Sequence, residues 1–176
     1  LTHDLDGIVI ATPSAMHAQQ VQTAVREGLA VFCQKPLART ESETRATIEL
    51  AQYQNCLLGV DFSYRHVAGL AKARQIIADG SLGEIFMVDL TFHNAYGPDK
   101  PWFYDMKQSG GGCVIDLGSH LIDLCLWMLR DNCETHHPFA DVRRSLWRLG
   151  TRYTSQSEGV EDAAVIQWRV GKDTEV

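Results

Sequence analysis

The sequence has little of what marks membrane, secreted or nucleic-acid-binding proteins. No apolar run approaches the roughly 20 residues that a membrane-spanning helix needs, and no signal-peptide pattern precedes the first predicted strand. Basic residues are in the minority, because 16 Lys and Arg face 22 Asp and Glu. The resulting net charge of −6 argues against nucleic acid or an anionic membrane as a partner.

Paired cysteines are missing as well. The five cysteines are odd in number and show no C-x-x-C spacing. Each of them lies in or beside an apolar segment. This pattern favours reduced, buried thiols, and with them a cytoplasmic protein.

A phosphate-binding glycine loop is the third absence. The glycine cluster SGGGC at 109–113 does not fit the dinucleotide fingerprint G-x-G-x-x-G, because residue 115 is isoleucine and no strand leads into the cluster. Its glycines fit a close backbone approach at a helix N-terminus instead. The chain also opens at Leu1 without methionine and enters a strand almost at once, so we expect a piece of a longer protein.

Strand and helix signals alternate over residues 1–62. Short continuous apolar runs at 7–11, 29–33 and 56–60 predict three strands that are covered on both faces. Helical spacing separates these runs, and a capping box at 40–43 opens the second helix. Because a strand–helix–strand unit crosses over right-handedly, the strands should be parallel. The sequence therefore predicts an α/β first domain.

Residues 63–176 follow a different pattern. The expected elements are a helix near 66–79, an alternating strand at 84–92, a loop at 93–112, a long apolar helix at 113–130, and strands at 141–149 and 162–170. This second part is predicted to be an α+β domain. The fold class is therefore α/β, with a parallel sheet followed by an α+β domain whose sheet is mostly antiparallel.

The ends of two predicted strands form the first candidate site. Ligands of open parallel sheets bind outside the carboxyl ends of the strands, and Thr12-Pro13 and Gln34-Lys35 follow consecutive strands there. His17 lies one turn into the first helix. A lone lysine after a strand is usually a solvated loop residue. Here Pro36 fixes the backbone beside Lys35, which favours a functional lysine.

The apolar helix at 113–130 carries the second candidate site. Asp116, His120 and Asp123 fall at i, i+4 and i+7 and share one face of this helix. The structural interpretation is a stripe of polar groups that satisfy their hydrogen bonds, and Asp123 fits it. The functional interpretation is an acid/base pair, in which Asp116 orients His120 for proton transfer.

Two weaker features complete the set of candidates. Trp102 lies in an aromatic run of the loop before this helix and could line a pocket, with ordinary packing as an equal alternative. A metal site would need a ligand from beyond the helix. His136 and His137 offer one only weakly, so no metal is predicted.

These residues together resemble the Gfo/Idh/MocA family, the group of glucose–fructose oxidoreductase and inositol dehydrogenase. The matching stretches are DGIVIATPSAMHAQQVQTAVREGLAVFCQKPLA, GVDFSYRHVAGLAKARQIIADGSLGEI, SGGGCVIDLGSHLIDLCLWML and GVEDAAVIQW. They follow the family's order and span nearly the whole chain. The resemblance implies that 1–62 is the C-terminal part of a Rossmann dinucleotide-binding domain, and that 63–176 is a truncated substrate and oligomerisation domain.

The same resemblance implies an activity. The chain would belong to an oxidoreductase that moves hydride between a nicotinamide cofactor, NAD or NADP, and a hydroxyl of a sugar, inositol or related polyol. The catalytic residues would be Lys35, Asp116 and His120. The cofactor-binding residues would be Thr12, Pro13, His17, Gln34 and Lys35. The substrate-binding residues would be Lys35, Trp102, Asp116 and His120. The C-terminal sheet would form a homo-oligomer.

Two departures from the family leave alternatives open. The family usually has Glu-Lys-Pro where this chain has Gln34-Lys35-Pro36, and we expect Gln34→Glu, which restores the carboxylate, to be tolerated. The phosphate loop is absent, so the 176 residues alone are expected to bind the cofactor weakly and to be inactive. The rival hypotheses are a nucleotide-sensing regulator that binds without turnover and an assembly module of the same fold.

Overall fold

The computed structural model describes residues 4–129, 144–150, 159–170 and 174–176. The chain forms two compact units that interleave along the sequence. The first unit contains residues 1–62, 98–116 and 155–160, and the second contains 63–97, 117–154 and 161–176. The segment 98–116, which precedes the candidate catalytic histidine, thus packs with the N-terminal residues.

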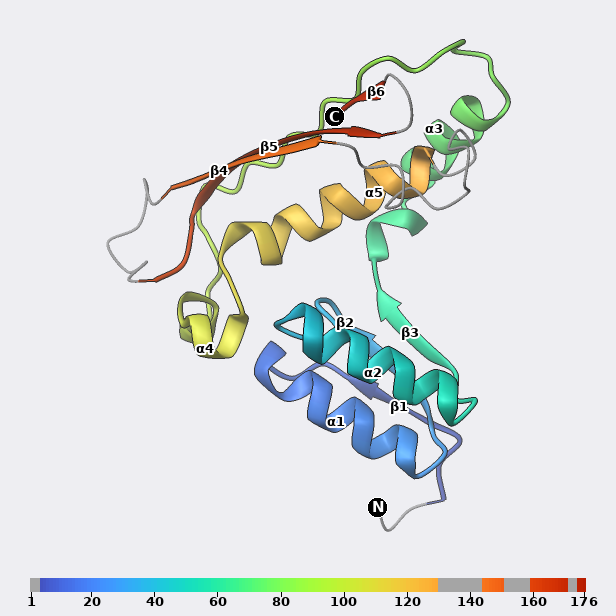
Figure 1. The fold of residues 1–176 in the computed structure, drawn as a ribbon, viewed down its shortest axis with the longest axis vertical. Helices are drawn as coiled ribbons and strands as arrows, with labels where there is room; N and C mark the ends of the chain where they lie inside the picture. The colour runs from blue at the N-terminus through green and yellow to red at the C-terminus, as the bar shows by residue number, and fades with distance from the viewer. Residues whose placement is uncertain (1–3, 130–143, 151–158, 171–173) are drawn as a thin grey trace. The chain divides into compact units, whose positions relative to one another are not determined.

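The first unit is built on a three-stranded parallel sheet (Figure 1). Its elements are β1 (Gly7–Ile10), α1 (Ser14–Arg26), β2 (Ala30–Gln34), α2 (Glu41–Tyr53) and β3 (Leu58–Asp61). The strands pair in the order β1-β2-β3, all parallel, with Ile8 opposite Val31. The predicted parallel arrangement is therefore confirmed. The capping box is confirmed too, because the amide of Glu43 donates to the Thr40 hydroxyl at 3.2 Å.

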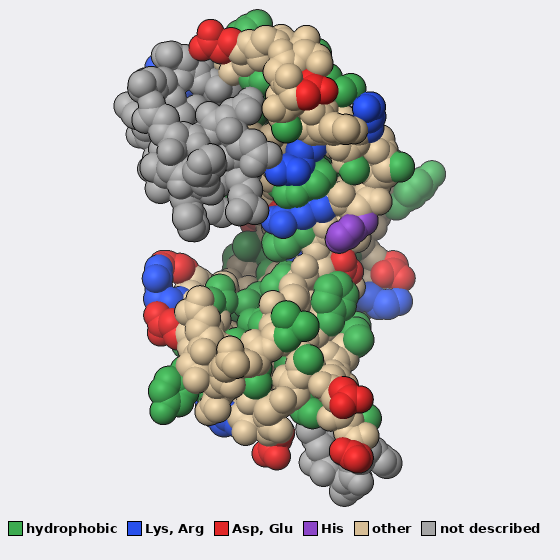
Figure 2. Space-filling view, turned by 90° about the vertical axis from the view of Figure 1, so that its right-hand side faces the viewer, with side chains coloured by type: hydrophobic (Ala, Val, Ile, Leu, Met, Phe, Trp, Pro, Cys, Tyr) green, Lys and Arg blue, Asp and Glu red, His purple; other side chains and the backbone are tan. Residues whose placement is uncertain are grey.

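The core of this unit lies between the sheet and its two helices, α1 and α2, which lie side by side on one face (Figure 1). The buried side chains of this core are Ile10, Val21, Ala24, Val25, Val31, Cys33, Leu37 and Ala51. The other face carries Val9 and Phe32, which are 68% and 46% exposed, and Figure 2 shows hydrophobic side chains at the surface of this unit. Among the described residues, the prediction of strands covered on both faces is therefore wrong.

The two faces of the sheet predict different responses to the same substitution. Val31→Ala should lower the free energy of unfolding by about 2 kcal/mol, because it removes buried methyl groups and leaves a cavity. Val9→Ala, the matched control on the exposed face, should change it by less than about 0.5 kcal/mol. Urea denaturation followed by circular dichroism measures both. Equal losses would mean that the face around Val9 is buried in solution.

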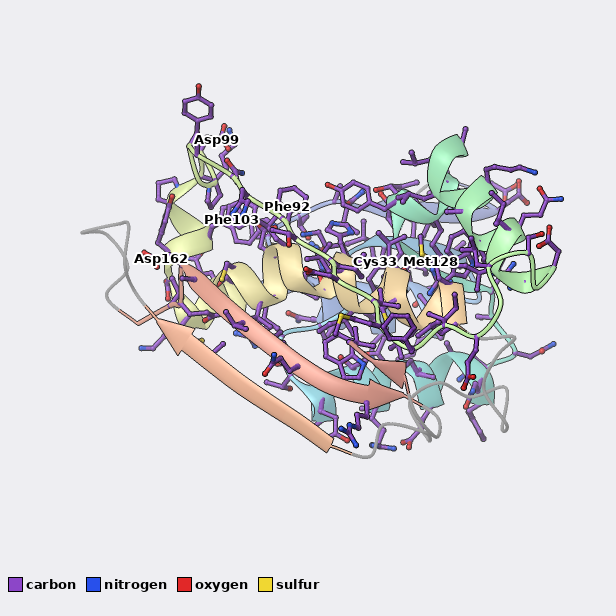
Figure 3. The ribbon with its side chains drawn as sticks, turned by 90° about the horizontal axis from the view of Figure 1, so that it is seen from above. Cys33, Phe92, Asp99, Phe103, Met128 and Asp162 are labelled. Atoms are coloured by element: carbon purple, nitrogen blue, oxygen red, sulfur yellow. The ribbon has the colours of Figure 1, made fainter. Side chains whose placement is uncertain are left out.

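The second unit packs helices against a small antiparallel sheet. Its elements are a 3₁₀ turn η1 (Ser63–His66), α3 (Ala68–Ala78), α5 (Ser119–Leu129), β4 (Arg144–Gly150), β5 (Ala163–Val170) and β6 (Thr174–Glu175). The central strand β5 pairs antiparallel with β4 and with β6. Figure 3 shows α5 beside β4 and β5, with Met128 labelled on α5 and Asp162 just before β5. The predicted antiparallel sheet is confirmed.

One predicted strand of this unit is wrong. The described residues 84–92 form no continuous strand. Ile85 and Val88 pack against the buried residues of α5, while Phe86 and Met87 are 74% and 58% exposed. Leu90 packs against the same cluster. The step from 85 to 88 therefore breaks the two-residue period that the sequence suggested, whereas the step from 88 to 90 keeps it.

The connection into α5 contains three short turns. These are the 3₁₀ turn η2 (Pro101–Tyr104), α4 (Met106–Ser109) and the π-helical turn η3 (Val114–Gly118). Gly110 ends α4 with a φ of 85°. The predicted helix at 113–130 is thus a wider π turn followed by an α-helix. Such turns are frequent at functional sites.

The stretch Met106–Leu129 also has the length and apolar composition that a membrane span requires, with 24 residues. The prediction that no apolar stretch approaches this length is therefore wrong. Core helices of soluble proteins meet the same requirement. Two ion pairs, Lys35–Asp116 and Arg65–Asp123, and the left-handed Gly110 within the stretch favour a helix packed in protein.

Candidate active site

Lys35 and Asp116 meet although 81 positions separate them in the chain. Lys35 directly follows β2, and Asp116 lies in the π turn. The Lys35 Nζ donates to the Asp116 carboxylate at 2.7 Å and to the Asp116 carbonyl oxygen at 2.6 Å. The side chains are 14% and 22% exposed. A charged donor and acceptor this close and this sheltered interact more strongly than a surface ion pair. The structure thus brings together two of the three predicted catalytic residues.

A buried histidine ties together the strand ends on which Thr12 and Lys35 lie. His17 on α1 is 1% exposed. Its Nδ1 lies 2.7 Å from the Pro36 carbonyl oxygen, and its Nε2 lies 2.7 Å from the Thr12 carbonyl oxygen. Both ring nitrogens therefore face the backbone. His17 was predicted to contact the cofactor. In the structure its ring contacts the backbone of both loops and holds them together.

The other residues predicted to contact the cofactor stand at the same edge of the sheet. Thr12 and Pro13 follow β1 and are half-buried, and the Thr12 hydroxyl donates to Gln20 Oε1 at 2.7 Å. Gln34 ends β2, and its amide donates to Asp61 Oδ2 at 2.6 Å. Asp61 ends β3 directly opposite Gln34. The carboxylate that the chain lacks at position 34 is therefore present one strand away. Asp61 was not among the predicted site residues, although its place directly after the third apolar run was a signal for a residue at this edge of the sheet.

This contact leads us to expect that Gln34→Glu lowers the stability of the protein. The new carboxylate would face that of Asp61 at hydrogen-bond distance, so the variant should lower the free energy of unfolding by about 1–3 kcal/mol at neutral pH. Thermal unfolding measures the loss. The double variant Gln34→Glu/Asp61→Asn exchanges donor and acceptor and should restore most of it. A single variant as stable as the wild type would show that the contact is absent in solution.

His120 belongs to the second unit and is 8% exposed. Its ring packs against Tyr64 with centroids 4.5 Å apart, and Tyr64 stacks against Phe92 at 6.3 Å. Neither aromatic residue was among the predicted site residues, because no local sequence pattern indicates that Tyr64 or Phe92 packs near His120. The predicted approach of His120 to Lys35 and Asp116 stays a prediction.

Asp123 is held by an arginine from η1. Arg65 Nε donates to Asp123 Oδ2 at 2.7 Å, and Arg65 Nη2 donates to Asp123 Oδ1. The hydrogen bond to Asp123 raises the pKa of Arg65 above its ordinary value. This two-point pairing accounts for a carboxylate on an apolar helix, and its partner comes from η1 instead of the polar stripe. The predicted structural role of Asp123 fits this contact.

The remaining candidates from the sequence have plain surroundings. Trp102 is half-buried and stacks on Phe103 with ring centroids 3.8 Å apart, so its contact with substrate stays a prediction. His136 and His137 lie outside the described residues. No group of three His, Cys, Asp or Glu within the described ranges could hold a metal ion.

The thiol of Cys33, two residues before Lys35 in the chain, is expected to be a poor nucleophile. Cys33 on β2 is fully buried, and burial raises the pKa of its thiol to about 11. A thiol with such a pKa stays protonated at neutral pH and is a poor nucleophile. Among the described cysteines, Cys33 and Cys56 carry free thiols.

The strand ends fit one half of a dinucleotide. Gln34 and Lys35 lie at the end of β2 and Thr12 follows the neighbouring strand β1, so an amide, an ammonium and a hydroxyl lie at the carboxyl edge of a parallel sheet, where such ligands bind. Donors of this kind suit ribose hydroxyls and a carboxamide. A pyrophosphate needs the backbone amides of a glycine-rich turn, and the 176 residues contain no G-x-G-x-x-G. The residues present therefore fit the nicotinamide half.

Comparison with known proteins gives two family matches and many relatives. Residues 1–62 match the oxidoreductase family with an NAD-binding Rossmann fold, and residues 70–176 match the GFO/IDH/MocA C-terminal domain. The levoglucosan dehydrogenase of Pseudarthrobacter phenanthrenivorans is 31% identical over 72% of this chain and 33% of its own length. The inositol 2-dehydrogenase of Rhizobium meliloti is 30% identical over 72% of this chain and 37% of its own length.

Solved structures agree with these matches. GenD2 from gentamicin A biosynthesis, in complex with NAD, superposes with a TM-score of 0.85 at 26% identity, over 97% of this chain and 46% of its own. An inositol dehydrogenase homolog from Azotobacter vinelandii, complexed with NAD+, has a TM-score of 0.84 at 27% identity, over 97% of this chain and 44% of its own. The chain thus spans less than half the length of these relatives. With both halves matched, the chain belongs to the Gfo/Idh/MocA oxidoreductase family.

Proposed function

We propose that this chain carries the catalytic residues of an NAD(P)-dependent oxidoreductase that acts on a hydroxyl of a sugar, inositol or related polyol. The observation that carries this proposal is the Lys35–Asp116 pair at 2.7 Å. It joins the end of β2 to the π turn that precedes α5 in the chain, and His120 lies on α5. Relatives named levoglucosan dehydrogenase and inositol 2-dehydrogenase support the substrate class.

The three residues divide the work of oxidising an alcohol. A bound nicotinamide would supply the hydride acceptor. His120 takes the hydroxyl proton, because imidazole suits proton transfer near neutral pH. The Lys35 ammonium has three N–H donors and gives two hydrogen bonds to Asp116. Its third donor would be available to the substrate oxygen, on which negative charge develops as the proton leaves.

Asp116 keeps the lysine in place. Its carboxylate and its carbonyl oxygen both accept from Lys35 Nζ, which fixes the direction of the remaining donor. A fixed donor needs little reorganisation during the reaction, and this is the main source of electrostatic stabilisation in active sites.

The cofactor would be held mainly by groups outside these catalytic residues. We assign Thr12, Pro13, Gln34 and Lys35 to its nicotinamide half, with His17 bracing their loops through Pro36 and Thr12. The 176 residues alone should bind a dinucleotide weakly, because they contain no G-x-G-x-x-G sequence to hold the pyrophosphate. Choice between NAD and NADP would rest on residues beyond this nicotinamide half.

Turnover by the intact protein tests the proposal. The protein is mixed with NAD or NADP and a panel of sugars and polyols, and nicotinamide absorbance is followed. Reduction of the cofactor with at least one polyol is the expected result. Saturable binding of the cofactor without turnover on any substrate would instead favour the nucleotide-sensing regulator.

We also propose that copies of this protein associate through the C-terminal sheet in the cytoplasm. Val165 on β5 is 59% exposed, although it lies in the middle of a strand. One exposed apolar side chain is common on a monomer, so the association is proposed from the family resemblance, and Val165 gives a position at which to test it. Sedimentation of the wild type and of Val165→Glu tests this, because the charged variant should shift the protein toward monomer. The free thiols of Cys33 and Cys56 support a reducing compartment.

A further inference from the structure

We propose that Arg39 is a positioning residue, which holds Asp116 against Lys35 by clamping the segment 105–112 onto the segment 35–40. The Arg39 clamp consists of Arg39, Glu43, Lys107 and Gly110. The catalytic meaning of this clamp rests on the proposed function, whereas its geometry does not. Every residue involved belongs to the first unit.

Arg39 links two segments that are distant in the chain. It lies in the connection from β2 to α2, shortly after Lys35. Its Nη1 donates to the Lys107 carbonyl oxygen, 68 positions away. Because the acceptor is a backbone carbonyl, this hydrogen bond does not use the side chain at position 107.

Glu43 holds the arginine in this direction. Its Oε1 accepts from Arg39 Nη2 at 2.7 Å, and its Oε2 accepts from the Arg39 backbone amide at 3.1 Å. These hydrogen bonds, the side-chain one first, lower the pKa of Glu43 below its ordinary value. The contribution of this carboxylate is present above its unfolded-state pKa and is lost as pH falls through the lowered pKa. The clamp is therefore intact at neutral pH.

Gly110 seats the second segment directly on the first. A Cβ added at Gly110 would lie 2.7 Å from the Arg39 Cβ and 2.9 Å from the Arg39 Cα, closer than real contacts allow. The φ of Gly110 is 85°, which side chains rarely adopt. Glycine is thus required twice at this position, for conformation and for space.

The two segments are therefore joined at two places. Arg39 meets Lys107 and Gly110 at one place, and Lys35 meets Asp116 at the other. Between these places the first segment is anchored by Leu37 and Ala38, each 6% exposed. With both segments fixed in this way, release of Arg39 should free the 105–112 segment and, with it, the position of Asp116.

The rate at which acetic anhydride acetylates Lys35 tests the Arg39 clamp and requires no enzyme activity. Peptide mass spectrometry measures this rate on the 176-residue chain. In the wild type Lys35 should react slowly, and exposed Lys72 serves as the internal reference. Arg39→Ala should raise the Lys35 rate about tenfold, because loss of hydrogen bonds from a charged group favours local opening. Gly110→Ala should do the same from the other segment. Arg39→Lys, which keeps a charged donor, should restore part of the protection.

Three controls separate positioning from stability. Asp116→Asn weakens the acceptor itself and should raise the Lys35 rate directly. Arg45→Ala breaks the exposed ion pair Arg45–Glu41 on α2, the helix that also carries Glu43, and should leave the Lys35 rate unchanged. Val31→Ala destabilises the same unit away from both segments. A Lys35 rate in Arg39→Ala that stays within about twofold of wild type, or that Val31→Ala reproduces, would overturn the proposal.

Kinetics of the intact protein then separate this proposal from the proposed function. If the protein turns over a polyol, Arg39→Ala should lower kcat about tenfold, because the placement of a charged group is lost. If no wild-type turnover is found, the proposed function fails while the acetylation result still decides the clamp. Where Arg39→Ala does not fold, Glu43→Gln keeps the arginine and gives the same measurements.

Discussion

His120→Ala is expected to lower the kcat of the intact protein on its polyol substrate by about 10²–10⁴-fold. The substitution removes the group that accepts the hydroxyl proton, and water is a much weaker base. The KM for the cofactor should change little, because His120 is not among the residues assigned to the nicotinamide half. Steady-state kinetics with the substrate found in the panel measures both parameters.

The dependence of kcat on pH gives the sharper result. In the wild type kcat should fall as pH is lowered, because a protonated imidazole cannot accept a second proton. The variant should lose this acidic limb. His66→Ala is the matched control, since His66 is an exposed histidine of η1 in the same unit. A loss in kcat of less than about tenfold for His120→Ala would show that another group is the base.

The parallel sheet could be predicted from the sequence because its signals are local. Each strand of 7–10, 30–34 and 58–61 is a short apolar run, and each helix between them begins or ends at a recognisable residue. Thr40 caps α2 through the Glu43 amide, as the spacing of the capping box requires. Given these elements, handedness leaves the parallel arrangement as the natural solution.

The segments that were predicted wrongly depend on distant contacts. The sequence of residues 84–92 alternates as that of a strand does, yet Ile85 and Val88 pack against the apolar side of α5. The π turn before α5 leaves no trace in the hydrophobic pattern, because one extra residue per turn shifts only a few positions. The exposed face around Val9 has the composition of a buried one.

The candidate site shows the same division. Lys35 could be predicted because it directly follows a buried strand, and Asp116 because a carboxylate on an apolar helix needs a partner. Asp61 had a local signal in its place at the end of the third apolar run, but its contact with Gln34 depends on the strand register. Arg39 had none, since its role arises from a carbonyl 68 positions away. Contacts of this kind are set by tertiary packing, which the residue types do not encode locally.

Lys35→Met should lower kcat by about 10²–10³-fold, the usual loss when one preorganised donor to a developing negative charge is removed. Lys35→Arg should recover little of it, because the planar guanidinium is wider and cannot give both hydrogen bonds to Asp116 in the geometry of an ammonium. The same variant also tests stability. Loss of Lys35 leaves the Asp116 carboxylate, 22% exposed, without its ion-pair partner, which should cost about 1–3 kcal/mol of unfolding free energy.

A double variant separates these two effects. Lys35→Met/Asp116→Leu removes both charges and should regain most of the lost stability, because no isolated charge remains. Its kcat should stay as low as that of Lys35→Met, since the donor to the substrate oxygen is still missing. Lys100→Met is the matched control, because it breaks the Lys100–Asp99 pair, whose side chains are 61% and 80% exposed, and should change neither quantity. If the double variant regained kcat together with stability, Lys35 would serve only to neutralise Asp116, and the substrate oxygen would be stabilised by another residue.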